Sequence, residues 1–460
     1  MALSSLPGTI RTAGLLAFAP LIAAALLLLA APPARAQVLI RDAEIERALK
    51  ELAQPILAAA GLSSERVQIL VLQDNSLNAF VADSQHIFLN SGLIRKMKTP
   101  AMLQAVIAHE AAHISNGHIT RRLVNARSTR TAAGLGMLLS AVVAVAGNTA
   151  AAGGVAVGSA ESARRVFLGN TRAEESAADQ SGARFLASAG VDPSAMIDVL
   201  EIFRGQEALA ASRQDPYTRT HPLWSARLRA VRGYAAAYRP RGQASPDNAY
   251  WFARARGKLE AFTGNPSRIL RQLRQAEQND ITLMQRAVAY HRLPDPEKAL
   301  ENINALVARR PNDPYVQELK GQILLESRQF QAAVRAYARA VDLSPRQPLV
   351  LAGYGRALLA LDTSAGNRRA LEALERARAR DPRQPRMMRD LALAYARAGN
   401  NGMASLATAE RYALLGRLED AALHAERASG LLPRGSTSWN RAQDVLSAAE
   451  PAASQGRRRR

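Results

Sequence analysis

The chain has 460 residues, enough for two or three domains that each bury a hydrophobic core. It contains no cysteine, which excludes disulfides, thiolate metal sites and lipid attachment to an N-terminal cysteine. The net charge is +21, and 54 of the 60 basic residues are arginine, so the chain is attracted to anionic membrane surfaces. We expect no nucleic-acid partner, because aromatic residues make up only 5% of the chain and follow no basic groove pattern.

The N-terminal segment predicts export. A single charge, Arg11, precedes an apolar run over residues 13–31, and Ala34-Arg35-Ala36 then forms an A-x-A cleavage site. We expect cleavage after Ala36, a mature chain that begins at Gln37, and a periplasmic protein that can associate with the membrane. An uncleaved membrane anchor is the alternative, because the apolar run is nearly long enough to span a bilayer.

The spacing of apolar residues predicts an α+β domain after this segment, mostly helical with a small sheet. An exposed edge strand of such a sheet can hold an extended polypeptide by backbone hydrogen bonding. Thr99 and Pro100 form a typical start for a long apolar helix. The predicted elements are helices at 42–60, from about 93, from 100, at 172–189 and at 223–238, and strands at 67–72, 77–82 and 86–90.

The long apolar helix carries an H-E-x-x-H motif, His109-Glu110-Ala111-Ala112-His113. Two histidines four residues apart share one helix face, so both imidazoles can bind one metal ion. Glu110, on the adjacent edge of that face, can act as a general base on a water molecule. The chain has only 7 histidines, which makes chance a weak explanation. The motif predicts a zinc peptidase.

A catalytic zinc site needs a third protein ligand and one position for water. Residue 119 is isoleucine, which excludes the pattern that continues to a third histidine. Glu175 and Asp179 lie four residues apart on a later predicted helix. Glu175 can therefore bind the metal while Asp179 accepts the other ring N–H of a ligating histidine. Glu174 is the neighbouring choice, but its spacing from Asp179 is wrong for a shared face.

Residues 131–160 are almost entirely small or aliphatic, broken by glycines. Neither half reaches the length of a membrane-spanning helix. Two interpretations are open: a helical hairpin packed in the core, or an apolar flap near the active site that touches lipid or unfolded substrate. The second would add a peripheral membrane contact.

A helical repeat array is predicted from residue 267, after a Pro/Gly-rich break at 239–246 and a bridging helix. Prolines at 311 and 345 close two units that are 34 residues apart, the tetratricopeptide period. Stacked units bury small residues between them and leave a concave binding surface. The small residues at matching offsets are Ala299, Ala333, Ala370 and Ala421, with Gly321 and Gly355 in the first helices.

Two irregularities interrupt the repeat. The unit that ends at Pro382 carries three extra residues, which we place at 362–369 in the connection between its paired helices. The last gap, up to Pro433, contains an additional helix at 387–398. Beyond it, residues 436–460 are expected to form a basic, disordered tail.

Together, His109-Glu110-x-x-His113 and Glu175-x-x-x-Asp179 resemble the M48 family of zinc metallopeptidases. The strands at 78–80 and 87–93 fit that family, whereas Asp83-Ser84 replaces a turn that is often Gly-Gly. The resemblance implies one Zn²⁺ per chain bound by His109, His113 and Glu175. It also implies that Glu110 is the base and acid and that Asp179 orients a ligand.

The signal segment and the repeats resemble the periplasmic branch of this family, which acts in outer-membrane protein quality control. His221-Pro222 matches a segment of that branch. His221 can donate to the oxyanion, fill the open zinc position and keep the enzyme latent, or cap a helix. His118 lies off the ligand face and is expected to be structural.

The expected architecture is a zincin-like peptidase domain at 37–245, a bridging helix at 246–266 and an all-α tetratricopeptide solenoid at 267–435. The expected function is a zinc endopeptidase that cleaves misfolded or stalled envelope proteins. Its repeats would bind substrate or the outer-membrane assembly machinery. The alternative is a chaperone or assembly adaptor with a latent zinc site, and the intact Glu110 favours the peptidase.

Overall fold

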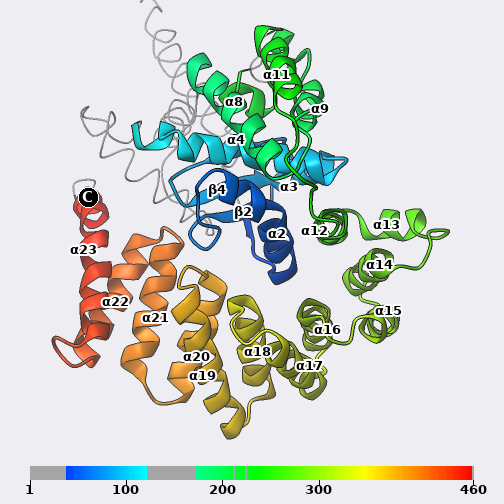
Figure 1. The fold of residues 1–460 in the computed structure, drawn as a ribbon. Helices are drawn as coiled ribbons and strands as arrows, with labels where there is room; N and C mark the ends of the chain where they lie inside the picture. Colours follow the sequence, from blue (N-terminus) through cyan, green and yellow to red (C-terminus); the bar gives the residue numbers. More distant parts are fainter. Residues whose placement is uncertain (1–37, 122–170, 211–212, 223–224, 458–460) are drawn as a thin grey trace, which may run out of the picture.

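The computed structural model describes residues 38–121, 171–210, 213–222 and 225–457 (Figure 1). The predicted signal segment and the apolar segment at 131–160 lie outside the described residues. Within the described ranges, we find no helix whose length and hydropathy would let it cross a bilayer.

The structure confirms the predicted fold class, a helical domain with a small sheet followed by an all-α solenoid. The strand at 39–40 and the short helices at 195–202 and 216–220 were not predicted, because such brief elements leave no periodic pattern. The first domain contains β1 (Leu39–Ile40), α2 (Ala43–Ala59), β2 (Gln68–Leu72), β3 (Ala79–Val81), β4 (His86–Asn90), α3 (Ser91–Lys96), α4 (Pro100–Ser115), α8 (Arg172–Ser188), α9 (Ala195–Ile202), α10 (Pro216–Thr220) and α11 (Ser225–Ala237).

The sheet has the strand order β1-β2-β4-β3, so β1 and β3 form its edges. β2 and β4 are parallel, and the other two pairs are antiparallel. Successive side chains alternate between the faces. Ile87 and Leu89 pack into the core formed with α2 and α4. Leu72, Phe80 and Phe88 form a separate apolar cluster on the opposite face.

The turn between β3 and β4 closes without glycine. Asp83 accepts a hydrogen bond from the backbone N–H of Gln85 at 2.7 Å, and its carboxylate lies 2.8 Å from Nδ1 of His86. These bonds fix the turn through the side chain of Asp83.

The helix α4 begins as the sequence predicts. Pro100 occupies its first turn, and the hydroxyl of Thr99 accepts a hydrogen bond from the N–H of Met102 at 3.2 Å. Its residues from Met102 to His113 are buried on every side. One polar link ties it to α2, where Gln104 donates to the carbonyl of Leu52 at 3.0 Å.

The predicted bridging helix is α12 (Asn248–Thr263), and it belongs to both domains. Phe252 and Leu259 lie in the core of the first domain, whereas Ala261 lies in the first core cluster of the solenoid. The solenoid then continues through α13 (Pro266–Gln272), α14 (Asp280–Arg292), α15 (Pro296–Arg309), α16 (Pro314–Glu326), α17 (Phe330–Leu343), α18 (Pro348–Leu361), α19 (Ser364–Arg380), α20 (Pro385–Arg397), α21 (Asn401–Leu414), α22 (Leu418–Leu431) and α23 (Thr437–Arg457).

The small residues of the repeat lie where neighbouring helices touch. The four alanines at matching offsets are fully buried: Ala299, Ala333, Ala370 and Ala421. A Cβ on Gly321 would lie 2.7 Å from the ring of Tyr337 on α17. The additional helix predicted in the last gap is α20.

Two expectations for the solenoid need correction. The three extra residues do not form a loop, because α18 ends at Leu361 and α19 begins at Ser364. They lengthen α19 instead. The expected disordered tail at 436–460 is wrong for residues 437–457, which form α23 and pack against α22 through the fully buried Ala442, and residues 458–460 lie outside the described residues. The buried Ala442 and Ala449 let α23 cover the apolar end of the array, as a terminal helix of a repeat array does.

The solenoid curves below the first domain with its concave side toward the sheet and α2 (Figure 1). The start of α2 contacts it directly, since Ala43 shares an apolar cluster with Tyr315 and Val350. A buried ion network lies beside this cluster. The ammonium of Lys258 is 2.9 Å from the carboxylate of Asp42 and 3.1 Å from that of Glu44.

Candidate metal centre

The H-E-x-x-H histidines lie on one face of α4, as their spacing requires. Their ring centroids are 4.8 Å apart, and the two Nε2 atoms are separated by 3.2 Å. Both side chains are buried. The Nε2 atoms of both rings therefore face the same enclosed point.

The helix α8 brings Glu175 to these imidazoles. Its carboxylate oxygens lie 3.4 Å from Nε2 of His109 and 3.3 Å from Nε2 of His113. Gly182 lies where the two helices meet, and a Cβ there would be in ordinary van der Waals contact with the backbone of α4, 3.4 Å from Ala108. The neighbouring Glu174 instead closes a capping box with Thr171 at the start of α8.

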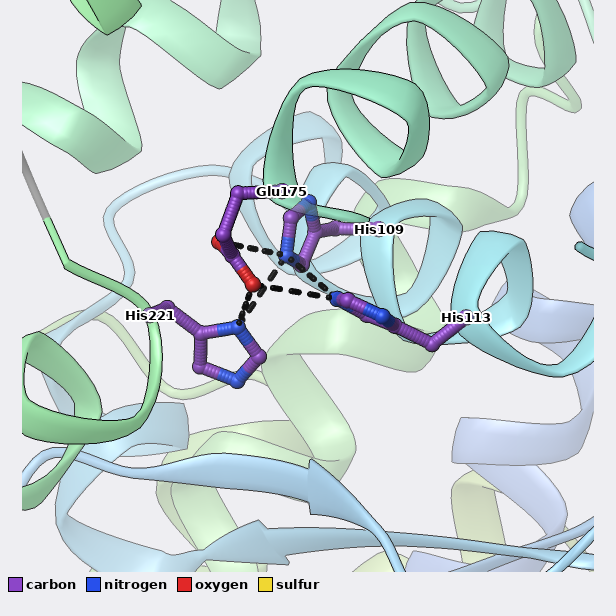
Figure 2. A group of neighbouring side chains, drawn as sticks. All are labelled: His109, His113, Glu175 and His221. Atoms are coloured by element: carbon purple, nitrogen blue, oxygen red, sulfur yellow. Dashed lines mark hydrogen bonds and ion pairs between the residues drawn. The ribbon is translucent and has the colours of Figure 1, made fainter. Parts of the chain in front are cut away.

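His221 completes the cluster from the segment between α10 and α11. Its Nδ1 lies 2.9 Å from Glu175 and 3.3 Å from His109 (Figure 2). The backbone N–H of His221 donates to the carbonyl of Tyr217 at 2.7 Å, and the Tyr217 ring packs on the imidazole at 4.5 Å. One ligand atom from each of His109, His113, Glu175 and His221 lies within 4.8 Å of the others.

Three further side chains hold the cluster in place. Asp179 lies 3.0 Å from Nδ1 of His109, which fixes the ring so that Nε2 faces inward. Nδ1 of His118 lies 2.9 Å from Nδ1 of His113. Arg227 binds both oxygens of Asp179 at 2.7 and 2.9 Å and contacts Glu175 at 2.8 Å.

Arg227 and Tyr217 were missed from the sequence, and His118 was given no role at the site. Arg227 is one of 54 arginines, so its residue type carried no signal. Its position shortly after His221 on a helix was the only clue. A purely structural His118 was expected because it lies off the face of α4, but the chain turns back after Ser115 and returns its ring to His113.

Glu110 is fully buried, and neither of its carboxylate oxygens accepts a hydrogen bond from any described residue. Nε2 of His221 lies 3.4 Å away. Burial raises the pKa of Glu110, which holds it closer to the neutral range in which a base can also act as an acid. A buried carboxylate without donors is costly unless a bound group completes its surroundings.

The charges of the site favour a bound cation. Burial opposes a proton on His109, yet the carboxylates of Glu175 and Asp179 raise its pKa to about 10. Burial lowers the pKa of His113 to about 3, so that ring is a free electron-pair donor at neutral pH. Imidazoles with one carboxylate are a donor set suited to Zn²⁺. A divalent cation therefore fits the residues present.

Residues 40–235 match the family model described as Peptidase family M48. This part of the chain is a peptidase of family M48. The M48 domain and the solenoid together are 26% identical, over 404 residues, to the beta-barrel assembly-enhancing protease of Escherichia coli (strain K12). That alignment covers 86% of this chain and 81% of the relative.

A putative beta-barrel assembly-enhancing protease of Vibrio cholerae is 31% identical over 223 residues, covering 48% of this chain and 45% of that protein. Among solved structures, MamA MSR-1 C2 is 19% identical with a TM-score of 0.29, covering 38% of this chain and 97% of that chain. A thermophilic TPR protein of Thermus thermophilus is 18% identical with a TM-score of 0.27, covering 43% of this chain and 94% of that chain.

The family match and the buried cluster agree on the kind of enzyme. An M48 domain is that of a metalloprotease, and the described residues bring two histidines, a glutamate and a third histidine to one point. The chain is therefore a metalloprotease with a tetratricopeptide-type solenoid.

Proposed function

We propose that this protein is a periplasmic zinc endopeptidase that hydrolyses misfolded or stalled envelope proteins. The observation that supports the proposal is Glu110, a buried carboxylate that accepts no hydrogen bond from the described residues and lies beside four side chains able to hold a metal ion. A purely structural metal site has no need of such a base. The similarity to proteases named for β-barrel assembly supports the envelope as the compartment, and the predicted signal segment supports export.

In this proposal His109, His113 and Glu175 hold one Zn²⁺, and Asp179, His118 and Arg227 orient them. The metal would supply Lewis-acid polarisation of the scissile carbonyl and acidify the attacking water. Glu110 takes the proton of that water and then passes it to the leaving amine. Its raised pKa suits both transfers.

The edge strand β3 would hold the substrate. Ala79 pairs with Leu89 of β4, while the neighbouring Asn78 carbonyl accepts the N–H of Asn90. In an antiparallel pair this alternation turns the N–H and carbonyl of Ala79 away from β4. An extended polypeptide can add to that side of β3, beside the cluster.

His221 would keep the enzyme latent in two ways. Nδ1 reaches the cluster as a fourth ligand, which takes the position that water needs. Nε2 lies 3.3 Å from the carbonyl of Ala79, the acceptor that a substrate N–H would use. Withdrawal of one ring would therefore open both the fourth position and the edge strand.

The test is casein cleavage by the mature chain from Gln37, loaded with zinc. Glu110→Gln should abolish turnover and retain one zinc per chain, because glutamine keeps the shape but cannot take a proton. His221→Ala should increase cleavage. Glu174→Gln, a change of the same kind at the residue that closes the capping box of α8 outside the metal cluster, is the matched control and should cleave like the wild type.

Absence of cleavage by every variant, with one zinc bound per chain, would support the chaperone or adaptor instead. Full complementation of a deletion strain by Glu110→Gln would contradict peptidase activity as the physiological role. Cleavage that persists in Glu110→Gln would remove Glu110 as the base.

A further inference from the structure

A cavity of about 820 Å³ lies between the two domains, lined by the sheet on one side and by α16 to α20 of the solenoid on the other. Ligand pockets in proteins usually hold about 300–1,000 Å³, so this one is large. It lies on the sheet face opposite the core that contains α2 and α4. The metal centre therefore does not line it.

The sheet side of the cavity is apolar and ends at a strand edge. Leu70, Leu72 and Phe88 line it from alternating positions of neighbouring strands. The carbonyl of Val38 accepts the N–H of Gln73, so the backbone groups of Leu39 point away from β2. An extended chain can pack apolar side chains on this face and pair with that edge.

The solenoid side of the cavity is basic. Three of its arginines, Arg380, Arg383 and Arg386, line the cavity and form no ion pair within the described residues, and Arg66 of the first domain lines it in the same way. Partial burial and the nearby cation of Arg356 lower the pKa of Arg386, although the carboxylates of Asp390 and Glu326 oppose this shift. Binding of an anion beside such an arginine stabilises its charged form.

Four carboxylates line the cavity, those of Asp42, Glu318, Glu326 and Asp381, and two of them form close ion pairs. Asp381 binds Arg41 at 2.5 Å, and Glu326 lies 2.7 Å from the ring of His291. Asp42 binds Lys258 at 2.9 Å. Six arginines against these four carboxylates give the lining a net positive formal charge, opposite an apolar floor.

We propose that this cavity binds an extended, acidic polypeptide segment of the protein substrate, with apolar side chains on the sheet and carboxylates on Arg383 and Arg386. The inference rests on the proposed function, since it assigns a substrate class to that endopeptidase. Strand pairing selects an extended chain, the alternating floor selects an alternating sequence, and the arginines select acidic residues.

Fluorescence anisotropy with the zinc-loaded Glu110→Gln chain tests this without turnover. The probe is a labelled twelve-residue peptide that alternates valine with glutamate. One comparison peptide replaces glutamate by lysine, and another replaces valine by serine. We expect binding of the first peptide and at least about tenfold weaker binding of the other two.

Arg383→Gln/Arg386→Gln should weaken binding of the acidic peptide by about tenfold. The matched control is Arg346→Gln/Arg368→Gln, which removes the same charge from exposed solenoid positions outside the cavity. Both double variants change surface residues, so folding should be preserved.

Equal binding of the acidic and lysine peptides, or equal loss in both double variants, would overturn the inference. Binding of anionic lipid vesicles at these arginines, with no binding of any peptide, would do so as well. Casein cleavage decides the proposed function separately, because peptide binding is measured on a variant without turnover.

Discussion

At the scale of single residues, Arg227 connects the parts of the metal centre. Its buried guanidinium binds Asp179 and Glu175 of α8 and also donates to the carbonyl of His221 at 3.2 Å. A side chain of another shape could not make all three contacts. Lysine provides a point charge on a flexible stem and cannot form this fork. In the proposed zinc site Arg227 is thus a positioning residue, because it contacts the proposed ligand Glu175, its neighbour Asp179 and the backbone of His221.

We predict that Arg227→Lys lowers zinc affinity and casein cleavage by about 10–100-fold, the usual effect of losing a residue that orients metal ligands. Zinc retention against a chelator and kcat measured at saturating zinc separate the two effects. Arg229→Lys, on the same helix and less buried, is the control and should behave like the wild type. Unchanged zinc affinity in Arg227→Lys would mean that the ligands hold their positions without it.

The sequence predicted those residues of the site that follow a local rule. His109 and His113 share a helix face by spacing, and Glu175 was distinguished from Glu174 by its relation to Asp179. Arg227 was not predictable in this way, because its partners are 48 and 52 positions distant and only tertiary structure brings them together. Residue spacing carries information within a helix but not between helices.

At the scale of elements, the tetratricopeptide pattern predicted helix packing because its small residues let neighbouring helices approach closely. Gly321 on α16 faces the ring of Tyr337 on α17, and Gly353 on α18 faces the same ring from the other side. The ring is buried between the two helices. The repeat period was readable, but the lengthened α19 was not, since an insertion can extend a helix or a loop.

Gly321→Ala should destabilise the protein. Alanine favours the helix by about 1 kcal/mol, but overpacking against a ring that cannot move costs about 1–3 kcal/mol. Urea unfolding measures the net loss. Gly430→Ala, in α22 with nothing near the added methyl, should instead stabilise by about 0.5–1 kcal/mol. A stabilised Gly321→Ala would show that Tyr337 can shift.

At the scale of the whole molecule, the two domains are joined by charges that neither domain could bury alone. Lys258 on α12 is fully buried among Asp42, Glu44 and Glu318, the last from the solenoid. Glu44 also binds Arg254, which pairs with Asp313 at the start of α16. The sequence could not predict this network, because it depends on how the solenoid curves back to α2.

Lys258→Met should therefore cost about 3–5 kcal/mol of unfolding free energy, because it leaves buried carboxylates without their cation. Chemical denaturation followed by tryptophan fluorescence measures the loss. Lys298→Met removes an exposed lysine paired with Asp295 and should leave the transition almost unchanged. Equal effects of the two substitutions would show that the interdomain network contributes nothing beyond a surface pair.

The third carboxylate of that network makes stability depend on pH. Glu318 lies 3.8 Å from Lys258, farther than Asp42 and Glu44, and burial raises its pKa to about 7. The folded state keeps this proton between the ordinary glutamate pKa of about 4.3 and pH 7, whereas the unfolded state releases it. The free energy of unfolding contributed by Glu318 therefore falls as pH rises through this window.

Glu318→Gln should match the wild type below about pH 4 and exceed its stability above pH 7, because each unit of pKa difference corresponds to about 1.4 kcal/mol. Thermal unfolding of both proteins at pH 4, 6 and 8 measures the difference, with Glu372→Gln on α19 as control. If the two proteins differed in stability by the same amount at all three pH values, the effect of the substitution would not come from the titration of Glu318. A variant that is less stable at pH 8 would show that ionised Glu318 is a net stabilising partner of Lys258.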